Sequence, residues 1–305
     1  MLRNTINNYV ALRRAMGFKF YSQNSLLQCF AAFAEKRGDT HIRRQTVLEW
    51  ASLAPSPAQR HNRLLIVRRL AIAIEPEDKR HEVPPADAFG HRTSERRKPY
   101  ILSTDELKLL LTAALQLKSK SRIRPITGAT LFALLAATGL RVSEAIALNI
   151  QDLMEDGLMI RATKFRKDRL IPLHETTRQG LQHYLKHRLQ WNSINPSFFI
   201  SNKGNTLRYR AVEDLFLQLV RSIGLRDSAP NPGVCIHDLR HRFAVRSLEQ
   251  CPIRDPTAIS RHMIALSTYL GHAQLSNTYW YLQATPKLMS QIAKAQEAFY
   301  RKERK

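Results

Sequence analysis

The chain has 305 residues, 44% of them hydrophobic, and its 48 lysines and arginines against 25 aspartates and glutamates give a net charge of +23. This composition is globular, which excludes an intrinsically disordered chain, and the length favours two domains over one. A positive charge of this size exceeds what solubility requires and indicates a polyanionic partner.

Both halves of the chain are basic. Residues 1–98 carry 18 basic and 9 acidic side chains, a net +9, and residues 99–305 carry 30 and 16, a net +14. This distribution excludes a basic tail on a neutral domain and favours a protein that wraps double-stranded DNA with two basic lobes. A membrane-surface protein would need one basic amphipathic helix, and no run of about eighteen apolar residues predicts a membrane span.

The three cysteines, Cys29, Cys235 and Cys251, are far apart and form no Cys-x-x-Cys motif. They predict neither a disulfide framework nor a zinc site, and they suit packing positions in a reduced cytosol. The N-terminus has no apolar run of the signal-peptide kind. We therefore expect a cytoplasmic protein that associates with the nucleoid.

The first 75 residues are predicted to form a small helical domain. Apolar residues recur at helical spacing over residues 5–16, 25–36, 46–54 and 58–74, and no strand pattern appears. Basic residues cluster on these segments, and the candidates for DNA contacts are Arg43, Arg44, Arg60, Arg63, Arg68 and Arg69. The alternative remains open that these side chains only occupy the solvated faces of helices.

Residues 76–99 are predicted to be a linker, because they contain four prolines and a glycine and have no apolar periodicity. The basic run at residues 92–98 either lies along DNA between the two lobes or keeps an exposed segment soluble.

The next predicted domain, residues 100–286, begins with a helix capped at Ser103 or Thr104, followed by an almost wholly apolar helix at 126–137. Gly139 ends that helix and another begins at residue 143, so Arg141 lies in a tight corner between two helices. A guanidinium held in this way can bind a phosphate through two parallel hydrogen bonds. The alternative is a structural arginine that caps carbonyl groups.

A β-hairpin is predicted from the alternating residues 158–163, a turn at 165–168 and the apolar segment 170–173. Lys164 lies where the first strand meets the turn. Downstream, a further short strand is expected at 197–201 and a helix at about 210–223. Beside that helix, Arg208 and Arg210 are candidates for contacts with the DNA backbone.

His237 and Arg240 lie three residues apart at the start of an expected helix, which puts both side chains on one face. Together with Arg141 they can surround one phosphate and neutralise the charge of its transition state. The same His-x-x-Arg pattern occurs at residues 41–44, where no chemistry is implied, so spacing alone is not diagnostic. His241 does not complete a zinc motif, because the glutamate of the His-Glu-x-x-His pattern is missing.

The segment 270–282 contains Gly271, His272 and two tyrosines, Tyr279 and Tyr281. A tyrosine keeps its proton until about pH 10, so it is a poor nucleophile unless cations stabilise the developing charge. On a helix the two tyrosines would point about 200 degrees apart, so only one can face a phosphate.

In this order and at these spacings, the stretches around Arg141, Lys164, His237 and Tyr281 resemble the catalytic motifs of tyrosine recombinases, the integrase family that includes the Xer proteins, Cre and lambda integrase. The resemblance spans residues 99–282. It implies a mainly α fold with a small β-sheet, in which a helical N-terminal DNA-binding domain precedes an α+β catalytic domain.

The resemblance also implies a role for each site residue. The scissile phosphate would be held by Arg141, His237, Arg240 and His272, and Glu144 would keep the site in order. Lys164 would protonate the leaving 5′-oxygen as general acid, with Lys167 as its rival. Tyr281, nine residues beyond His272, would be the nucleophile, and Tyr279 is its near miss.

The expected reaction is site-specific DNA strand exchange through a 3′-phosphotyrosine intermediate, which conserves the bond energy and needs no cofactor and no metal ion. The expected partners are double-stranded DNA and further copies of the chain, as a dimer on each site and a tetramer in the synapse. Residues 287–305 would form a C-terminal helix that docks on a neighbouring subunit. The Thr-Tyr-Trp-Tyr segment resembles transposon-borne recombinases.

Two alternatives remain. A type IB topoisomerase uses similar chemistry to relax supercoiled DNA. An accessory protein would bind DNA without catalysis.

Overall fold

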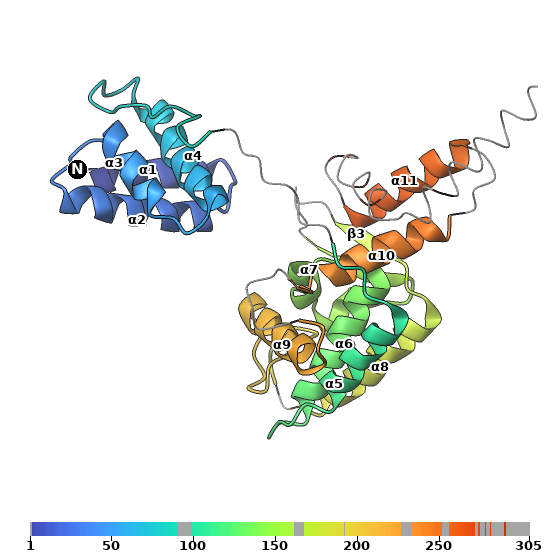
Figure 1. Cartoon of the computed structure of the whole chain (residues 1–305). Coiled ribbons are helices and arrows are strands. Elements are labelled where there is room, and N and C mark those ends of the chain that lie inside the picture. The colour runs from blue at the N-terminus through green and yellow to red at the C-terminus, as the bar shows by residue number, and fades with distance from the viewer. Residues whose placement is uncertain are drawn as a thin grey trace, which may run out of the picture. The chain divides into compact units, whose positions relative to one another are not determined.

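The structure is a computed structural model, which describes residues 2–90, 99–161, 168–191, 193–226, 233–251 and 256–271 and positions 274, 278, 281 and 290. The chain divides into two compact units, residues 1–97 and 98–305, and each is described by itself (Figure 1). None of the described helices has the length and apolar character needed to cross a membrane.

The described part of the first unit forms four helices around one apolar core: α1 (Leu2–Ala15), α2 (Tyr21–Lys36), α3 (Arg44–Ser52) and α4 (Pro57–Ile74). The rings of Phe30 on α2 and Trp50 on α3 meet edge to face, with centroids 5.4 Å apart. Ser56 caps α4 by accepting a hydrogen bond from the Gln59 amide. The four helices expected from apolar periodicity are confirmed, although each begins one to four residues earlier than the pattern indicates.

Residues 81–89, which fall within the segment expected to be a linker, pack against this helical unit. The buried ring of His81 accepts a hydrogen bond at Nδ1 from the Ile42 amide (3.1 Å), and the Glu82 amide donates to the Ile42 carbonyl (2.9 Å). Phe89 is partly buried against the core. The segment has no helix or strand, so its packing leaves no period in the sequence.

The second unit is built on α6 (Ile123–Thr138), which is buried along most of its length. This helix packs against α5 (Thr104–Leu115), α8 (Glu175–Leu189) and α10 (Asp238–Glu249) (Figure 1). The other described helices are α7 (Val142–Ile146), the 3-10 helix η1 (Ile150–Asp152), α9 (Tyr209–Ser222) and α11 (Pro256–Leu270).

A small antiparallel sheet has the strand order β1 (Leu153–Met154), β2 (Gly157–Ile160), β3 (Arg169–Ile171). Leu158 pairs with Ile171 across the last two strands. Gly157 has a φ of 152°, and a Cβ there would lie 2.2 Å from the Ile171 carbonyl oxygen, so the close approach of β3 requires glycine. The predicted hairpin is confirmed in β2 and β3, whereas β1 was not predicted.

The mainly α fold with a small β-sheet is confirmed. The strand predicted at residues 197–201 is wrong, because the segment makes only isolated bridges from Ser197 to Asn149 and from Ile200 to Thr206. Three consecutive residues there, 198–200, are all buried. Such a run has none of the alternation of a half-exposed strand, because it inserts into the core.

The start of α10 is fixed by hydrogen bonds to distant segments. The Asp238 carboxylate accepts from the Cys235 amide (2.8 Å) and from the Tyr100 amide (3.3 Å). The Arg242 guanidinium donates from Nε to the Leu102 carbonyl (3.0 Å). The first turn of α10 is therefore held against residues 100–102.

Candidate active site

Arg141 occupies the corner between α6 and α7. Gly139 ends α6 in the left-handed conformation, with a φ of 61°, and Arg141 precedes α7 with extended backbone. The Arg141 guanidinium donates from Nη1 to Glu144 Oε1 (2.7 Å) and from Nη2 to the Gly271 carbonyl (2.9 Å). The Arg141 side chain keeps 27% of its surface exposed. The corner thus holds the cation at the surface with its orientation fixed.

Arg240 contacts this corner and is almost wholly buried, with 2% exposure. Its guanidinium donates from Nη1 to the Gly139 carbonyl (2.6 Å) and from Nη2 to the Leu270 carbonyl (2.8 Å). Burial, followed by the positive charge of Arg141, lowers the pKa of Arg240 to about 10. Arg240 is therefore still a cation at neutral pH, and it joins the C-terminal ends of α6 and α11.

His237 lies immediately before α10, where its ring meets that of His241 edge to face at 4.7 Å. The surrounding protein and then the charge of Arg240 lower the pKa of His237 below its usual value, and Arg141 adds to the effect. The imidazole is consequently neutral at physiological pH and can donate one hydrogen bond.

Tyr281 lies against the same cations. Its side chain is 3% exposed and packs in an apolar cluster formed by residues of α10 and α11. The Tyr281 ring lies 5.4 Å from the ring of His241, and the phenol is close enough to Arg240 to oppose the fall in the pKa of that guanidinium. The structure therefore brings Arg141, His237, Arg240 and Tyr281 together, although they span 141 positions of the sequence.

The Glu144 carboxylate forms ion pairs with two arginines. Besides Arg141, its carboxylate accepts hydrogen bonds from Arg169 on β3, from Nη1 to Oε1 (3.2 Å) and from Nη2 to Oε2 (2.9 Å). Burial alone would raise the pKa of Glu144, but the hydrogen bonds from Arg169 and Arg141 outweigh it and lower the pKa below its usual value. The carboxylate is ionised and neutralises one of the two guanidinium charges.

Arg169 was not among the predicted site residues. The signal was present in the two-residue period of β3, where Arg169 shares a face with the buried Ile171 while Leu170 points outward. A charged residue on the buried face of a strand requires a partner, and here that partner is Glu144.

Four sequence candidates, Lys164, Lys167, His272 and Tyr279, lie outside the described residues. Among the residues that are described, no group of three or more His, Cys, Asp or Glu side chains is arranged to hold a metal ion.

Four of the six predicted DNA-contact arginines of the first unit donate from their side chains to partners within that unit. Arg60 donates to the Ala54 carbonyl (3.0 Å), Arg63 to the Trp50 carbonyl (3.1 Å), and Arg68 to the Pro84 carbonyl (2.5 Å). Arg43 pairs with Glu82 (3.3 Å), whose carboxylate also accepts from the Arg44 amide (2.8 Å). These contacts hold loops in place, so structural roles explain much of this basic cluster.

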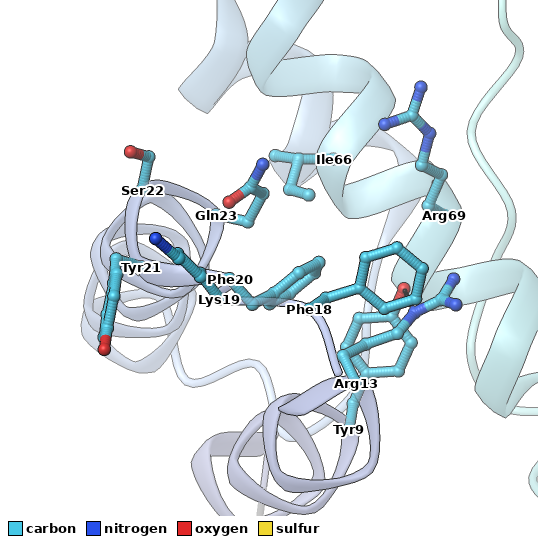
Figure 2. A pocket seen from close by; sticks show the side chains of 10 residues that line it. All are labelled: Tyr9, Arg13, Phe18, Lys19, Phe20, Tyr21, Ser22, Gln23, Ile66 and Arg69. Carbon is cyan, nitrogen blue, oxygen red and sulfur yellow. Dashed lines mark hydrogen bonds between the residues drawn. The ribbon is translucent and has the colours of Figure 1, made fainter. Parts of the chain in front are cut away.

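Arg69, the sixth of these arginines, lies on a cavity of about 600 Å³ between α1, α2 and α4 (Figure 2). The cavity is lined by aromatic rings and by cations, and none of its lining residues is acidic. Figure 2 shows Arg13 beside Tyr9 and Phe18, where its guanidinium lies 5.3 Å and 5.8 Å from the two ring centroids. Phe20 has a φ of 51°, which is rare for a residue with a side chain.

The two candidates at the start of α9 differ in their contacts. Arg208 is the residue immediately before the helix. Arg210 is 79% exposed and pairs with Glu213 (3.4 Å) and Asp214 (3.3 Å). Surface pairs of this kind are weak, so Arg210 remains available to an external anion.

A family model described as the phage integrase family matches residues 101–287. The chain belongs to this family. It is therefore a tyrosine-type site-specific DNA recombinase, and DNA relaxation and non-catalytic DNA binding are not favoured.

Known relatives of the recombinase cover most of its length. It is 37% identical over 308 residues to the putative integrase/recombinase y4rB of Sinorhizobium fredii (strain NBRC 101917 / NGR234), covering 97% of this chain and 96% of the relative. It is 30% identical to tyrosine recombinase XerC of Pseudomonas syringae pv. tomato, covering 65% of this chain and 60% of the relative.

Solved structures share the fold of the recombinase. The Tn1549 transposon integrase in complex with transposon right end DNA has a TM-score of 0.65 at 17% identity, covering 95% of this chain and 99% of that one. A lambda integrase dimer bound to a COC′ core site also has a TM-score of 0.65, at 16% identity, covering 94% and 78%.

Proposed function

We propose that the recombinase exchanges DNA strands with Tyr281 as its nucleophile. The phenol oxygen attacks a backbone phosphorus, the bond to the 5′-oxygen breaks, and the 3′ end stays attached to the protein as a phosphotyrosine. The 5′-hydroxyl of a second strand then attacks the phosphotyrosine, which restores the phosphodiester and releases the phenol.

The observation that supports this role best is the position of the buried Tyr281 side chain beside the His241 ring and close to the buried Arg240 guanidinium. A cation beside the phenol favours its ionised form, which is the nucleophile. Arg141 lies in the same cluster with its guanidinium partly exposed, so it can meet the phosphate while the buried charge of Arg240 adds to the electrostatic stabilisation of the pentavalent transition state. Because these cations are fixed by backbone carbonyls, they need little reorganisation during the reaction.

The remaining roles follow from the resemblance. Lys164 protonates the leaving 5′-oxygen, with Lys167 as the competing assignment, and His237 and His272 donate hydrogen bonds to the phosphate. Glu144 keeps Arg141 in place.

The proposal extends to the partners. The recombinase binds double-stranded DNA as a dimer on each site and pairs two sites in a tetramer, and both of its units are basic enough to associate with nucleoid DNA. In the first unit, Arg69 with its neighbours Arg13 and Lys19 forms an acid-free rim that fits a phosphate backbone. We also propose that it acts on a mobile element, a role that suits the name of its relative y4rB, putative integrase/recombinase.

A nicked suicide duplex tests the chemistry, because the cleaved end diffuses away and traps the covalent adduct. We expect an adduct with the unaltered chain and with Tyr279→Phe, and none with Tyr281→Phe. An adduct that survives Tyr281→Phe would refute this nucleophile. Absence of any adduct would favour a binding-only protein, and relaxation without joining of two sites would favour a topoisomerase.

A further inference from the structure

Arg169 lies where three separate segments of the catalytic unit meet. It is the first residue of β3, and its guanidinium binds Glu144 on α7 through both terminal nitrogens. It also lies against Gly271, where an added Cβ would be 3.1 Å from Arg169 Nη1 and 3.6 Å from Arg141 Nη1. The Arg169 side chain is only 17% exposed, so these contacts are sheltered from water.

The charges explain why a second arginine matters. Glu144 is 7% exposed, and a single buried carboxylate paired only with Arg141 would neutralise the cation offered to the phosphate. Because Arg169 occupies both carboxylate oxygens, the group of two arginines and one glutamate keeps a net charge of +1. Arg141 then retains positive charge and is also held in a fixed direction.

The contacts also connect the hairpin to the rest of the site. Arg141 donates to the Gly271 carbonyl, and Arg169 packs against the same glycine, which precedes His272. Gly271 has a φ of 66°, so this turn needs glycine both for its backbone and for the space that the guanidinium fills. A shift of Arg169 would therefore move β3, Glu144 and the turn after α11 relative to one another.

The geometry points to Arg169 as a positioning residue of the recombinase, which acts through Glu144 to orient Arg141 and leave it charged for the scissile phosphate. This inference rests on the proposed function, since it concerns the rate of the same phosphoryl transfer. A salt bridge that only stabilised the fold would make the same contacts, so the test must separate the two.

A double-mutant cycle measures the action through Glu144. The first-order rate of adduct formation on saturating suicide duplex is compared for the unaltered chain, Arg169→Met, Glu144→Gln and the double variant. We expect Arg169→Met to slow the reaction about 10- to 100-fold, as misplacement of a reacting group does. In the Glu144→Gln background, Arg169→Met should slow adduct formation less than about 3-fold, because the contact through which Arg169 acts on Arg141 is already lost. If the rate reductions of the two single variants multiply in the double variant, the two residues act independently and the inference is overturned.

The pH profile is a readout that a purely structural role does not move. Among the described residues, the charged groups facing Glu144 are Arg141, Arg169 and Arg240. Loss of Arg169 leaves burial opposed only by Arg141, so the pKa of Glu144 rises from its value in the unaltered chain and the carboxylate takes up a proton at a higher pH. The ratio of unaltered to Arg169→Met rate should therefore grow as the pH falls from 7.5 to about 5.5, and it should stay constant in the Glu144→Gln background. A ratio that is independent of pH in both backgrounds would overturn the inference.

Two further variants guard against misfolding. Arg169→Lys keeps the charge without the two-pronged contact, so we expect it to recover part of the rate and to fold if Arg169→Met does not. The matched control is Arg161→Met on the same hairpin, which removes an exposed arginine from Asp152 (2.7 Å) and should react at the unaltered rate. Failure of the proposed function would be recognised independently, because in that case the unaltered chain would form no adduct.

Discussion

Two glycines end the helices on either side of the Arg141 guanidinium. Gly139 follows α6 with a φ of 61°, and Gly271 follows α11 with a φ of 66°. At Gly139 an added Cβ would lie 2.5 Å from the Phe243 ring, and at Gly271 it would meet the Arg169 guanidinium. At both positions the left-handed backbone and the limited space require glycine. The carbonyls of these two glycines accept hydrogen bonds from Arg240 and Arg141, so the placement of both cations depends on them.

We expect Gly139→Ala to destabilise the catalytic unit by about 1–3 kcal/mol, because alanine is strained in the left-handed conformation and its Cβ would push Phe243 away. Urea unfolding followed by circular dichroism measures the change. The matched control is Gly180→Ala in the exposed part of α8, where a Cβ meets nothing within 4 Å and should stabilise the helix by about 0.5–1 kcal/mol. Equal effects of the two substitutions would contradict this view of Gly139.

At the scale of single residues, the sequence indicated the local positions of Arg141 and Arg240 but not the groups that hold their side chains. Arg141 and Arg240 could be picked out because they follow a glycine corner and open a helix, which are local patterns. The Gly139 and Leu270 carbonyls that hold Arg240 come from segments 101 and 30 positions away. No periodicity or motif links such positions, so these contacts appear only in the folded chain.

At the scale of elements, α1 to α7, α9 and α10 were expected from apolar stripes and capping residues, whereas α8 and α11 were not predicted. Further errors fall on segments without a period: the two-residue strand β1, the buried run at 198–200, and residues 81–89. In each of these, distant residues decide the conformation, so local spacing carries little information.

The packing of residues 81–89 leads to a prediction about the helical unit. A fragment of residues 1–90 should unfold at a clearly higher temperature than a fragment of residues 1–75. The shorter fragment loses the buried His81, the Glu82 contacts at α3 and the cover that Phe89 gives the core. Thermal unfolding followed by circular dichroism compares them, and equal midpoints would mean that the segment contributes nothing.

At the scale of the whole molecule, we expect residues 287–305 to act between subunits. Their apolar stripe, with Leu288, Ile292 and Phe299, suits a helix that packs on another surface. Deleting Lys287–Lys305 should leave single-site DNA binding in place while the slower-moving complexes that hold several subunits disappear. Native gel shifts with one and two sites measure this, and unchanged multimers after the deletion would contradict the prediction.

Arg240 gives the molecule a property that goes beyond its place beside the phenol. The guanidinium that charges the pocket also closes the open ends of two helices, at Gly139 and Leu270. A substitution of Arg240 would remove its catalytic charge and also its hydrogen bonds to the two helix ends, so the fold would be weakened together with the activity. A lineage that abandons catalysis would therefore first discard the phenol, and decayed copies of this recombinase should keep the arginine long after Tyr281 has changed.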